Sequence, residues 1–258
     1  MAEIHHLDQG QEQPRGNLGR LRQTITNADT LVAQIRDGIL GGSMKPGDFL
    51  GSERDISENY SVSRNTAREA LRSLAALGAV EIRLGVKGGA TIASGDAEAI
   101  GETLAIQHRL SGVPEDEVLE VQSVLEGLAA ERAAEHATPE DIKLLEDLLE
   151  EAETLINNPP AFSNSSLAFH MAIAEAAHSQ ALMMQLLSIR YFIWPPNNTV
   201  PNPKVAENVI RSHHRLLELI KNQDAAGAHE FMRDHIEHIR NQRRILREGG
   251  RPEDAACC

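Results

Sequence analysis

The stretch from Gly51 to Arg72 constrains the fold of this chain most, because its polar and apolar residues fit two short helices joined by a tight turn. Ser52, with Asp55 three residues later, is expected to cap the first helix and Ser63 the second, because an N-cap oxygen accepts from a backbone N–H that the helix leaves unpaired. A small apolar seam should let the helices cross closely. It consists of Ile56, Tyr60, Val62, Ala67, Ala70 and Leu71. The stretch therefore predicts a helix-turn-helix.

The second of these helices presents side chains that suit DNA. Arg64, Asn65, Thr66 and Arg68 occupy its first turn and a half, on the face opposite the seam. In a helix-turn-helix, this part of the second helix lies in the major groove against base edges and phosphates. Because such patterns are short and degenerate, an ordinary surface helix with scattered arginines is the alternative at this point.

A strand, a glycine-rich turn and a second strand are predicted directly after these helices. Residues 79–84 alternate in polarity, residues 85–89 are rich in glycine, and residues 90–93 are apolar. Such a hairpin is a wing, whose loop could lay Lys87 and the backbone of Gly88 against a phosphate or in the minor groove. A nucleotide-binding loop is the alternative, but neither a helix start nor a Lys-Ser/Thr pair follows the glycines as it requires.

Together, these residues resemble a known DNA-binding domain. The runs PGDFLGSERD (46–55) and VSRNTAREAL (62–71), followed by the glycine wing, resemble the winged helix-turn-helix of the GntR family of bacterial transcription regulators, over roughly residues 28 to 94. The resemblance implies that the operator is contacted by Arg54, Arg64, Asn65, Thr66 and Arg68. Gly51 stands where the family usually has proline, a departure expected to loosen the turn without altering the contacts.

The charge distribution is compatible with that reading. The net charge of the whole chain is −13, but residues 31–94 carry eight Lys/Arg against seven Asp/Glu, whereas residues 95–258 carry fourteen against twenty-seven. A near-neutral module can still present arginines on one face, while an acidic partner domain keeps its own surface away from phosphates. Charge therefore permits DNA binding without demanding it.

The whole chain is predicted to be mostly α-helical, with a winged helix-turn-helix followed by an antiparallel all-α bundle of six or seven helices. Aromatic residues make up only 3% of the chain, so the core must be aliphatic, which is typical of helical packing. The helices are expected from about 104 to 110, from Pro114, from Thr138 to Ile156, and over about 163–177, 180–193, 204–222 and 225–247. The predicted parts are a flexible arm (1–24), the DNA-binding domain (25–94), a helical effector-binding and dimerisation domain (95–248) and a flexible tail (249–258).

Targeting signals and a disulfide framework are not evident in the sequence. No apolar run approaches the ~20 residues that span a bilayer, and the N-terminus lacks the apolar segment of a secretory signal, so we expect a cytoplasmic protein. Cys257 and Cys258 stand side by side at the end of the sequence and cannot staple a core. They are expected to be exposed and incidental, with a redox or lipidation role as the alternative.

Three histidines are candidates for a metal site. His170, His213 and His235 belong to three different predicted helices, at positions that could face inward. Three neutral imidazoles can bind a divalent transition metal and leave open positions for water or an anionic ligand. The alternative is that each is a core histidine that satisfies hydrogen bonds. The remaining histidines of these helices are expected on other faces, in solvent: His214, His229 and His238.

This half of the chain resembles the effector-binding domain of the FadR-type branch of GntR regulators. The resemblance is carried by Phe169-His170 and by the residues His213, Ile220, Asp224, Ala228, Met232 and His235. It implies a metal, most often zinc or nickel, held by three histidines and by an Asp four residues before the first, next to a small carboxylate effector. Here Ser166 takes the Asp position, which should weaken the metal site. Gln122 replaces the arginine of the Val-Arg-x-x-Leu-Glu motif, so a larger or neutral effector such as an acyl chain becomes more credible.

The sequence thus predicts a homodimeric, ligand-responsive regulator whose two heads bind the half-sites of a pseudo-palindromic operator. Its partners would be operator DNA, a small-molecule effector and a second copy of the chain, with no membrane. A three-histidine metal-dependent enzyme with an accessory N-terminal domain is the alternative, but it needs a general base, and no inward carboxylate can be assigned near the histidines. A purely helical interaction module would leave the arginine-lined helix and the wing unexplained.

Overall fold

A computed structural model describes residues 26–85, 88–193 and 203–248. The chain forms two compact units, which divide between Gly95 and Asp96. The predicted arm (1–24) and the tail (249–258) with its two cysteines lie outside the described residues.

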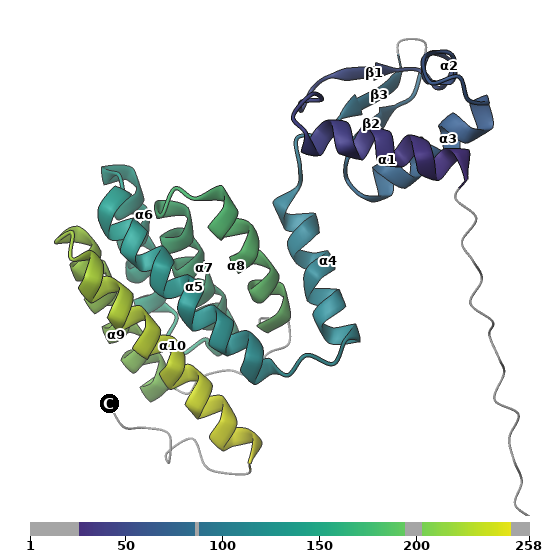
Figure 1. Ribbon diagram of the computed structural model, residues 1–258. Helices are drawn as coiled ribbons and strands as arrows, with labels where there is room; N and C mark the ends of the chain where they lie inside the picture. Colours follow the sequence, from purple (N-terminus) through teal and green to yellow (C-terminus); the bar gives the residue numbers. More distant parts are fainter. Residues whose placement is uncertain (1–25, 86–87, 194–202, 249–258) are drawn as a thin grey trace, which may run out of the picture. The chain divides into compact units, whose positions relative to one another are not determined.

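The first unit is a helical layer with a small antiparallel sheet (Figure 1). Its elements are α1 (Asn27–Leu40), β1 (Phe49–Gly51), α2 (Glu53–Asn59), α3 (Arg64–Ala76), β2 (Val80–Arg83) and β3 (Gly89–Ile92). β3 is the middle strand and pairs with β2 from Val80↔Ile92 to Arg83↔Gly89. The predicted winged helix-turn-helix is confirmed.

The predicted caps set the start of both helices in this motif. The Ser52 hydroxyl accepts from the backbone N–H of Asp55, and the Asp55 carboxylate accepts from the Ser52 N–H at 2.8 Å. The Ser63 hydroxyl accepts from the Thr66 N–H at 3.1 Å. The seam between α2 and α3 is dry, because Ile56 and Ala67 are completely buried in one core cluster.

Two features of the first unit differ from the sequence-based expectation. The helical spacing of Leu31, Val32, Ile35, Ile39 and Leu40 predicts a helix from Asp29, whereas α1 begins two residues earlier because Thr26 forms a capping box with Asp29. The strand β1 was not predicted. It ends at Gly51, whose φ is +108°. Proline, the usual residue of the family at this position, cannot adopt this φ because the pyrrolidine ring holds φ near −65°. A Cβ on Gly51 would also lie 2.8 Å from the Cβ of Asp55, so this glycine is required for the entry into α2 and does not merely loosen the turn.

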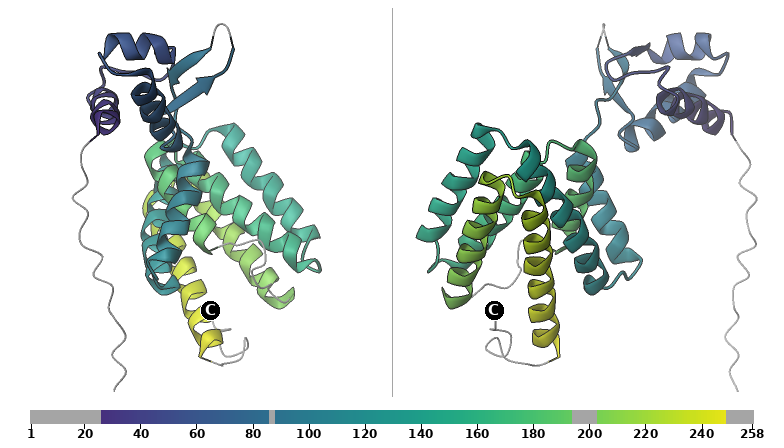
Figure 2. Two further views of the ribbon diagram at one scale, coloured as in Figure 1. Left: turned by 90° about the vertical axis from the view of Figure 1, so that its right-hand side faces the viewer. Right: turned by 60° about the vertical axis from the view of Figure 1, so that its left-hand side comes forward.

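The second unit is a bundle, with seven helices within the described part of the chain, as predicted. They are α4 (Ala97–Leu110), α5 (Glu115–His136), α6 (Pro139–Thr154), α7 (Pro159–Ala176), α8 (Gln180–Ile193), α9 (Pro203–Lys221) and α10 (Ala225–Arg247). The helix α10 packs along α5, and α4 packs along α8 (Figures 1 and 2). The core is aliphatic apart from a few rings, with Leu119, Leu145 and Ile173 completely buried.

Two helix starts in this unit were placed too late. The helix α4 begins at Ala97 and not near Leu104, because the Asp96 side chain accepts from the Ala99 N–H at 3.0 Å and caps it. The helix α7 begins at Pro159, where the expectation had put a loop, because proline is well tolerated at the first helical positions. In the described residues we find no helix with both the length and the apolar character needed to cross a membrane.

The cap of α6 gives a first prediction. The Thr138 hydroxyl accepts from the Asp141 N–H at 3.2 Å, and the Asp141 carboxylate accepts from the Thr138 N–H at 2.8 Å. Thr138→Ala is expected to lower the free energy of unfolding by about 1 kcal/mol, measured as a lower urea midpoint at unchanged slope. Thr154→Ala is the control, because that hydroxyl only donates to the Glu151 carbonyl within the same helix. Equal losses in both variants would contradict the role of the cap.

Candidate nucleic-acid interface and metal centre

One face of α3 carries the side chains predicted to meet DNA. Arg64, Asn65 and Arg68 are exposed, while Ala67, Ala70, Leu71 and Leu74 are buried on the opposite face. Thr66 is half-buried, and its hydroxyl shares a 2.8 Å hydrogen bond with the hydroxyl of the capping Ser63. Three of the four side chains are therefore accessible to a ligand, whereas Thr66 also closes the start of the helix.

Two of the predicted arginines are held by neighbouring carboxylates. Arg68 donates through Nε and Nη2 to the carboxylate of Glu53, at 2.9 Å and 2.7 Å, and Arg54 donates to Glu58 at 2.8 Å. The hydrogen bond from Arg68 lowers the pKa of the Glu53 carboxyl and raises the pKa of Arg68 itself. These pairs are exposed and contribute little to stability, but they orient both guanidinium groups. Arg64 forms no ion pair within the described part of the chain.

The wing has a tight turn that only glycine can make at one position. The Gly88 N–H donates to the Gly85 carbonyl at 2.8 Å, and a Cβ on Gly88 would lie 2.2 Å from the Arg83 carbonyl oxygen. Lys87, the other wing residue predicted to contact DNA, lies outside the described residues.

The second unit brings the three predicted histidines together. His170 on α7, His213 on α9 and His235 on α10 are all buried, and each offers a ring nitrogen within 4.8 Å of the other two. Their ring centroids are 5.0 to 5.4 Å apart. Phe169 stacks on His213 at 4.3 Å and closes one side of this cluster, which we call the histidine site.

The chemistry of the histidine site fits a divalent metal. Burial, reinforced by the neighbouring imidazoles, lowers the pKa of His213 well below its usual value, and burial lowers the pKa of His235 to about 3. Both rings are therefore neutral at pH 7 and can act as ligands. Their Nε2 atoms are buried and have no hydrogen-bond partner, which is costly unless something binds them. In a tetrahedral site with zinc–nitrogen bonds of about 2.0–2.1 Å, the ligand nitrogens lie about 3.3–3.4 Å apart, so these ring nitrogens, which lie within 4.8 Å of one another, would have to move closer together around an ion.

A carboxylate also faces the histidine site, contrary to the expectation that none does. Glu126 on α5 is buried, and its Oε2 lies 2.5 Å from Nδ1 of His170. Its other oxygen accepts from the Gln122 amide at 2.5 Å. A carboxylate on Nδ1 fixes the ring's tautomer and leaves Nε2 free as a ligand. The sequence carried a signal for this residue, because Glu126 stands one helical turn after Gln122 in the same motif and so shares its face.

The other candidates lie around the site. Ser166 is buried on α7, one turn before His170, at the position where the resemblance called for Asp. His214, His229 and His238 are outside the histidine site, as expected, but only His214 is exposed. It pairs with Glu153 at 2.9 Å, while the half-buried His229 pairs with Glu131 at 2.8 Å.

Comparison with known proteins identifies a family for both units of the chain. Residues 27–88 match the family model "Bacterial regulatory proteins, gntR family", and residues 117–238 match the FCD domain. The Uxu operon transcriptional regulator of Escherichia coli (strain K12) is 30% identical over 227 residues, covering 81% of this chain and 84% of that protein. The chain belongs to the GntR family.

Two further relatives support this GntR assignment. The HTH-type transcriptional regulator LutR of Bacillus subtilis (strain 168) is 26% identical over 211 residues, covering 78% of this chain and 94% of that protein. The solved structure of Streptococcus agalactiae GntR superimposes with a TM-score of 0.60 at 25% identity, covering 83% of this chain and 99% of that one. The FCD match fits the FadR-type branch, and α3 and the histidine site fall inside the two matched regions. The matched family and these relatives are transcription regulators and not enzymes, which confirms the expectation that this chain is a regulator and not a metal-dependent enzyme.

Proposed function

We propose that this GntR protein is a cytoplasmic, homodimeric regulator that binds a pseudo-palindromic operator. Binding of a small effector to the helical unit would raise or lower its affinity for that operator. One observation carries the proposal. The chain carries exposed Arg64, Asn65 and Arg68 at the start of α3, the second helix of the helix-turn-helix. It also contains the buried histidine site within the region that matches the FCD domain. The first is an output surface and the second an input site.

The proposed DNA contacts divide by chemistry. Arg64, Asn65 and Arg68 protrude from the first turns of α3 and would meet base edges, with Thr66 beside them. Arginine and asparagine form bidentate pairs with guanine and adenine in the major groove. Arg54, on the neighbouring helix, would fix the register on a phosphate, and the wing residues Lys87 and Gly88 would reach the minor groove.

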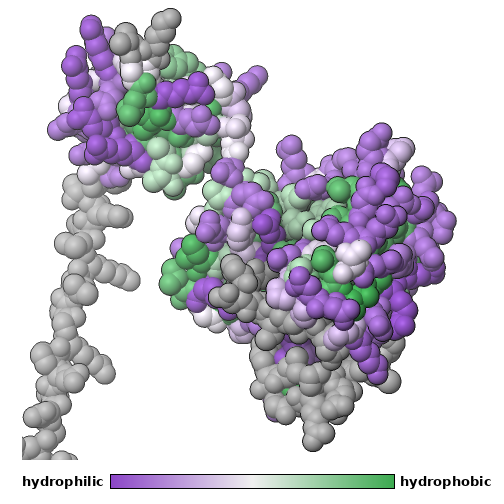
Figure 3. Space-filling view, turned by 180° about the vertical axis from the view of Figure 1, so that it is seen from behind, coloured by the Kyte–Doolittle hydropathy of each residue, from purple (hydrophilic) through white to green (hydrophobic). Residues whose placement is uncertain are grey.

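The proposed dimer is supported by apolar surface on the helical unit. Six large apolar side chains on α4 and α5 are exposed by 39–76%: Ile100, Ile106, Leu110, Val121, Val124 and Leu128. Figure 3 shows apolar side chains gathered in patches on the surface of this unit. Exposed apolar patches mark interaction sites, and most oligomers of soluble proteins are symmetric pairs. A second copy bound to this surface would give the assembly two DNA-binding units, one for each half-site of the operator.

The proposed input is a metal, zinc or nickel, in the histidine site with a carboxylate or acyl effector beside it. Ser166 is a weaker ligand than the usual aspartate, so the histidines must provide most of the affinity. Ser166 and Gln122 are the proposed effector neighbours on the α7 and α5 side. Neither is charged, so they offer hydrogen bonds to an effector but no countercharge.

The DNA-binding proposal is tested with fragments that the wild-type protein selects from a random pool. Arg64→Ala is expected to weaken binding to the selected DNA about tenfold in a gel-shift titration, within the 1–3 kcal/mol typical of such contacts. Arg36→Ala is the control, because Arg36 is an exposed arginine on α1 that pairs with the adjacent Asp37 and is not among the residues expected to contact DNA. Failure of the wild type to enrich any sequence, or unchanged binding by Arg64→Ala, would refute the proposal.

A further inference from the structure

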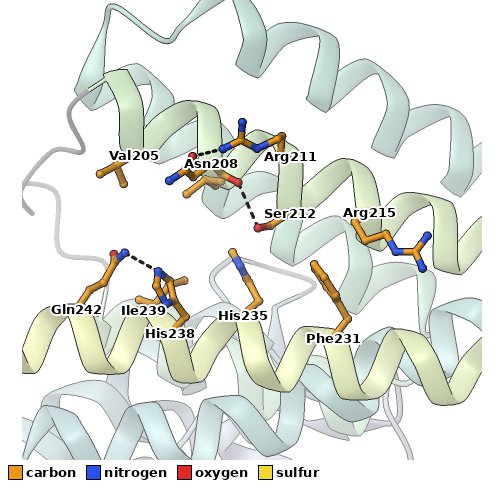
Figure 4. A pocket seen from close by; sticks show the side chains of 11 residues that line it. Val205, Asn208, Arg211, Ser212, Arg215, Phe231, His235, His238, Ile239 and Gln242 are labelled. Atoms are coloured by element: carbon orange, nitrogen blue, oxygen red, sulfur yellow. Dashed lines mark hydrogen bonds between the residues drawn. The ribbon is translucent and has the colours of Figure 1, made fainter. Parts of the chain in front are cut away.

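The ion pair between Arg68 and Glu53 differs from the other ion pairs of the first unit. Among the described residues, each of the other three lies within a single helix or strand: Arg36–Asp37, Arg54–Glu58 and Arg83–Glu81. On α9 of the second unit, Arg211 also has a local partner, because it donates to Asn208 three residues earlier (Figure 4). Glu53 and Arg68, in contrast, are 15 residues apart and join the first residue of α2 to the second turn of α3.

The hydrogen bonds of this pair fix the plane of the guanidinium group. Nε of Arg68 donates to both oxygens of Glu53, at 2.9 and 3.1 Å, and Nη2 donates to one of them at 2.7 Å. A guanidinium group is planar and has five N–H donors, of which these contacts use the one on Nε and one on Nη2. Within the described part of the chain, Nη1 makes no hydrogen bond. The edge formed by Nη1 and the second N–H of Nη2 therefore remains free and points away from Glu53.

This free edge suits one base in the major groove. Guanine presents two acceptors there, N7 and O6, and an arginine that donates to both is the most frequent base-specific contact of proteins with DNA. Adenine presents an acceptor beside a donor, so it cannot accept two hydrogen bonds from the same edge. Because Glu53 holds the plane of Arg68 before DNA arrives, less side-chain freedom is lost on binding.

Glu53 also changes how this part of the surface interacts with phosphates. The hydrogen bond from Arg68 lowers the pKa of Glu53, so its carboxylate is ionised at neutral pH and offsets the charge of the arginine. A neutralised arginine attracts the phosphates of any DNA sequence less strongly. Specificity is a difference between affinities, so a carboxylate that weakens non-specific attraction while orienting a base contact acts on both terms.

We propose that Glu53 is a positioning residue for base recognition, which holds Arg68 so that its free edge faces a guanine in each half-site of the operator. Glu53 is not among the residues that the family resemblance assigned to DNA. The inference rests on the proposed contact between α3 and the major groove, and it adds the residue that directs one of those contacts and the base that is read.

The test uses the full-length protein and the DNA that the wild type selects from a random pool. Each base pair of a half-site is replaced in turn, and affinities are measured by gel-shift titration at fixed salt. Arg68→Ala identifies the position that Arg68 reads, as the one where the preference for guanine is lost. Glu53→Gln is expected to reduce the preference for guanine at that same position at least about threefold, because an amide cannot hold both N–H groups of Arg68.

Glu58→Gln is the matched control. Glu58 lies on the same helix and pairs with Arg54 through a single hydrogen bond at 2.8 Å. The change removes the same charge and releases an arginine that is assigned to a phosphate, so the base preferences of wild type should be kept at every position. Both variants should bind unselected DNA at least as tightly as wild type. The cap of α2 by Ser52 and Asp55 is untouched in both variants, and helical circular dichroism checks their folding.

Three results would overturn the inference. Arg68→Ala could change no base preference, Glu53→Gln could keep the preference of wild type for guanine, or both glutamine variants could relax it equally. The double variant Glu53→Gln/Arg68→Ala should match Arg68→Ala alone, and a further loss at another position would show that Glu53 reads a base itself.

Failure of this inference and failure of the proposed function give different results. If the wild type enriches no sequence, the proposed regulator falls and this inference falls with it. If the wild type enriches a sequence and Glu53→Gln reads it as wild type does, only the role of Glu53 is refuted.

Discussion

Replacing His213 with alanine is expected to reduce bound zinc or nickel from about one ion per chain to less than about a tenth, because a three-ligand site that loses one ligand no longer holds its metal. His213 is the most buried of the three histidines, at 1% exposed. Its Nε2 is one of the two buried ring nitrogens in the site without a partner. The measurement is metal content by mass spectrometry after loading and extensive dialysis.

The neighbouring residue provides the control for this prediction. His214 is exposed on the other face of α9 and pairs with Glu153, so His214→Ala should keep the metal content of wild type. Since His213 stacks on Phe169, its removal also leaves a cavity, and His235→Gln serves as a second variant with a smaller change in volume. Folding of all variants is checked by helical circular dichroism. Metal retained by folded His213→Ala and His235→Gln would mean that the histidines are core residues and not ligands.

The parts of the fold that were predictable are those set by local chemistry. The capping serines of α2 and α3 and the capping box of α6 each act within four residues, so the sequence alone located these helix starts. The strand β1 was missed because it is only three residues long and exists through pairing with β3, a distant contact. The start of α4 was missed because a single capping residue, Asp96, gives a weak signal in the stretch before the helix expected from about residue 104.

The histidine site was predictable in part for the same reason. Helical periodicity placed His170, His213 and His235 on inward faces, and the structure brings their rings together. Helical periodicity cannot predict which side chains of different helices contact each other. Glu126 lies 44 residues before His170, and its contact depends on how α5 packs against α7.

Glu126→Gln is expected to weaken metal binding by about 10- to 100-fold while leaving the chain folded, the usual range when the hydrogen-bond partner of a ligating histidine is lost. In the wild type, the carboxylate accepts from both His170 and Gln122. An amide keeps one acceptor oxygen but replaces the other with an NH₂ group, so it cannot accept from both neighbours. If the new amide oxygen stays on His170, Gln122 must turn its own amide so that its free oxygen accepts from the new NH₂ group. The hydrogen bond that then holds His170 comes from a neutral acceptor and orients the ring less strongly than the carboxylate does.

The same helix offers a matched control for this change. Glu131 on α5 holds Nδ1 of His229 at 2.8 Å, a carboxylate–imidazole pair outside the histidine site, so Glu131→Gln should leave the metal affinity unchanged. Isothermal titration with zinc gives the affinities, and nitrogen NMR of the imidazoles reports whether the proton of His170 stays on Nδ1. Loss of affinity with an altered His170 tautomer in Glu126→Gln alone is the expected pattern. Equal affinities in both variants would show that Glu126 fills space in the core and does not position the ligand.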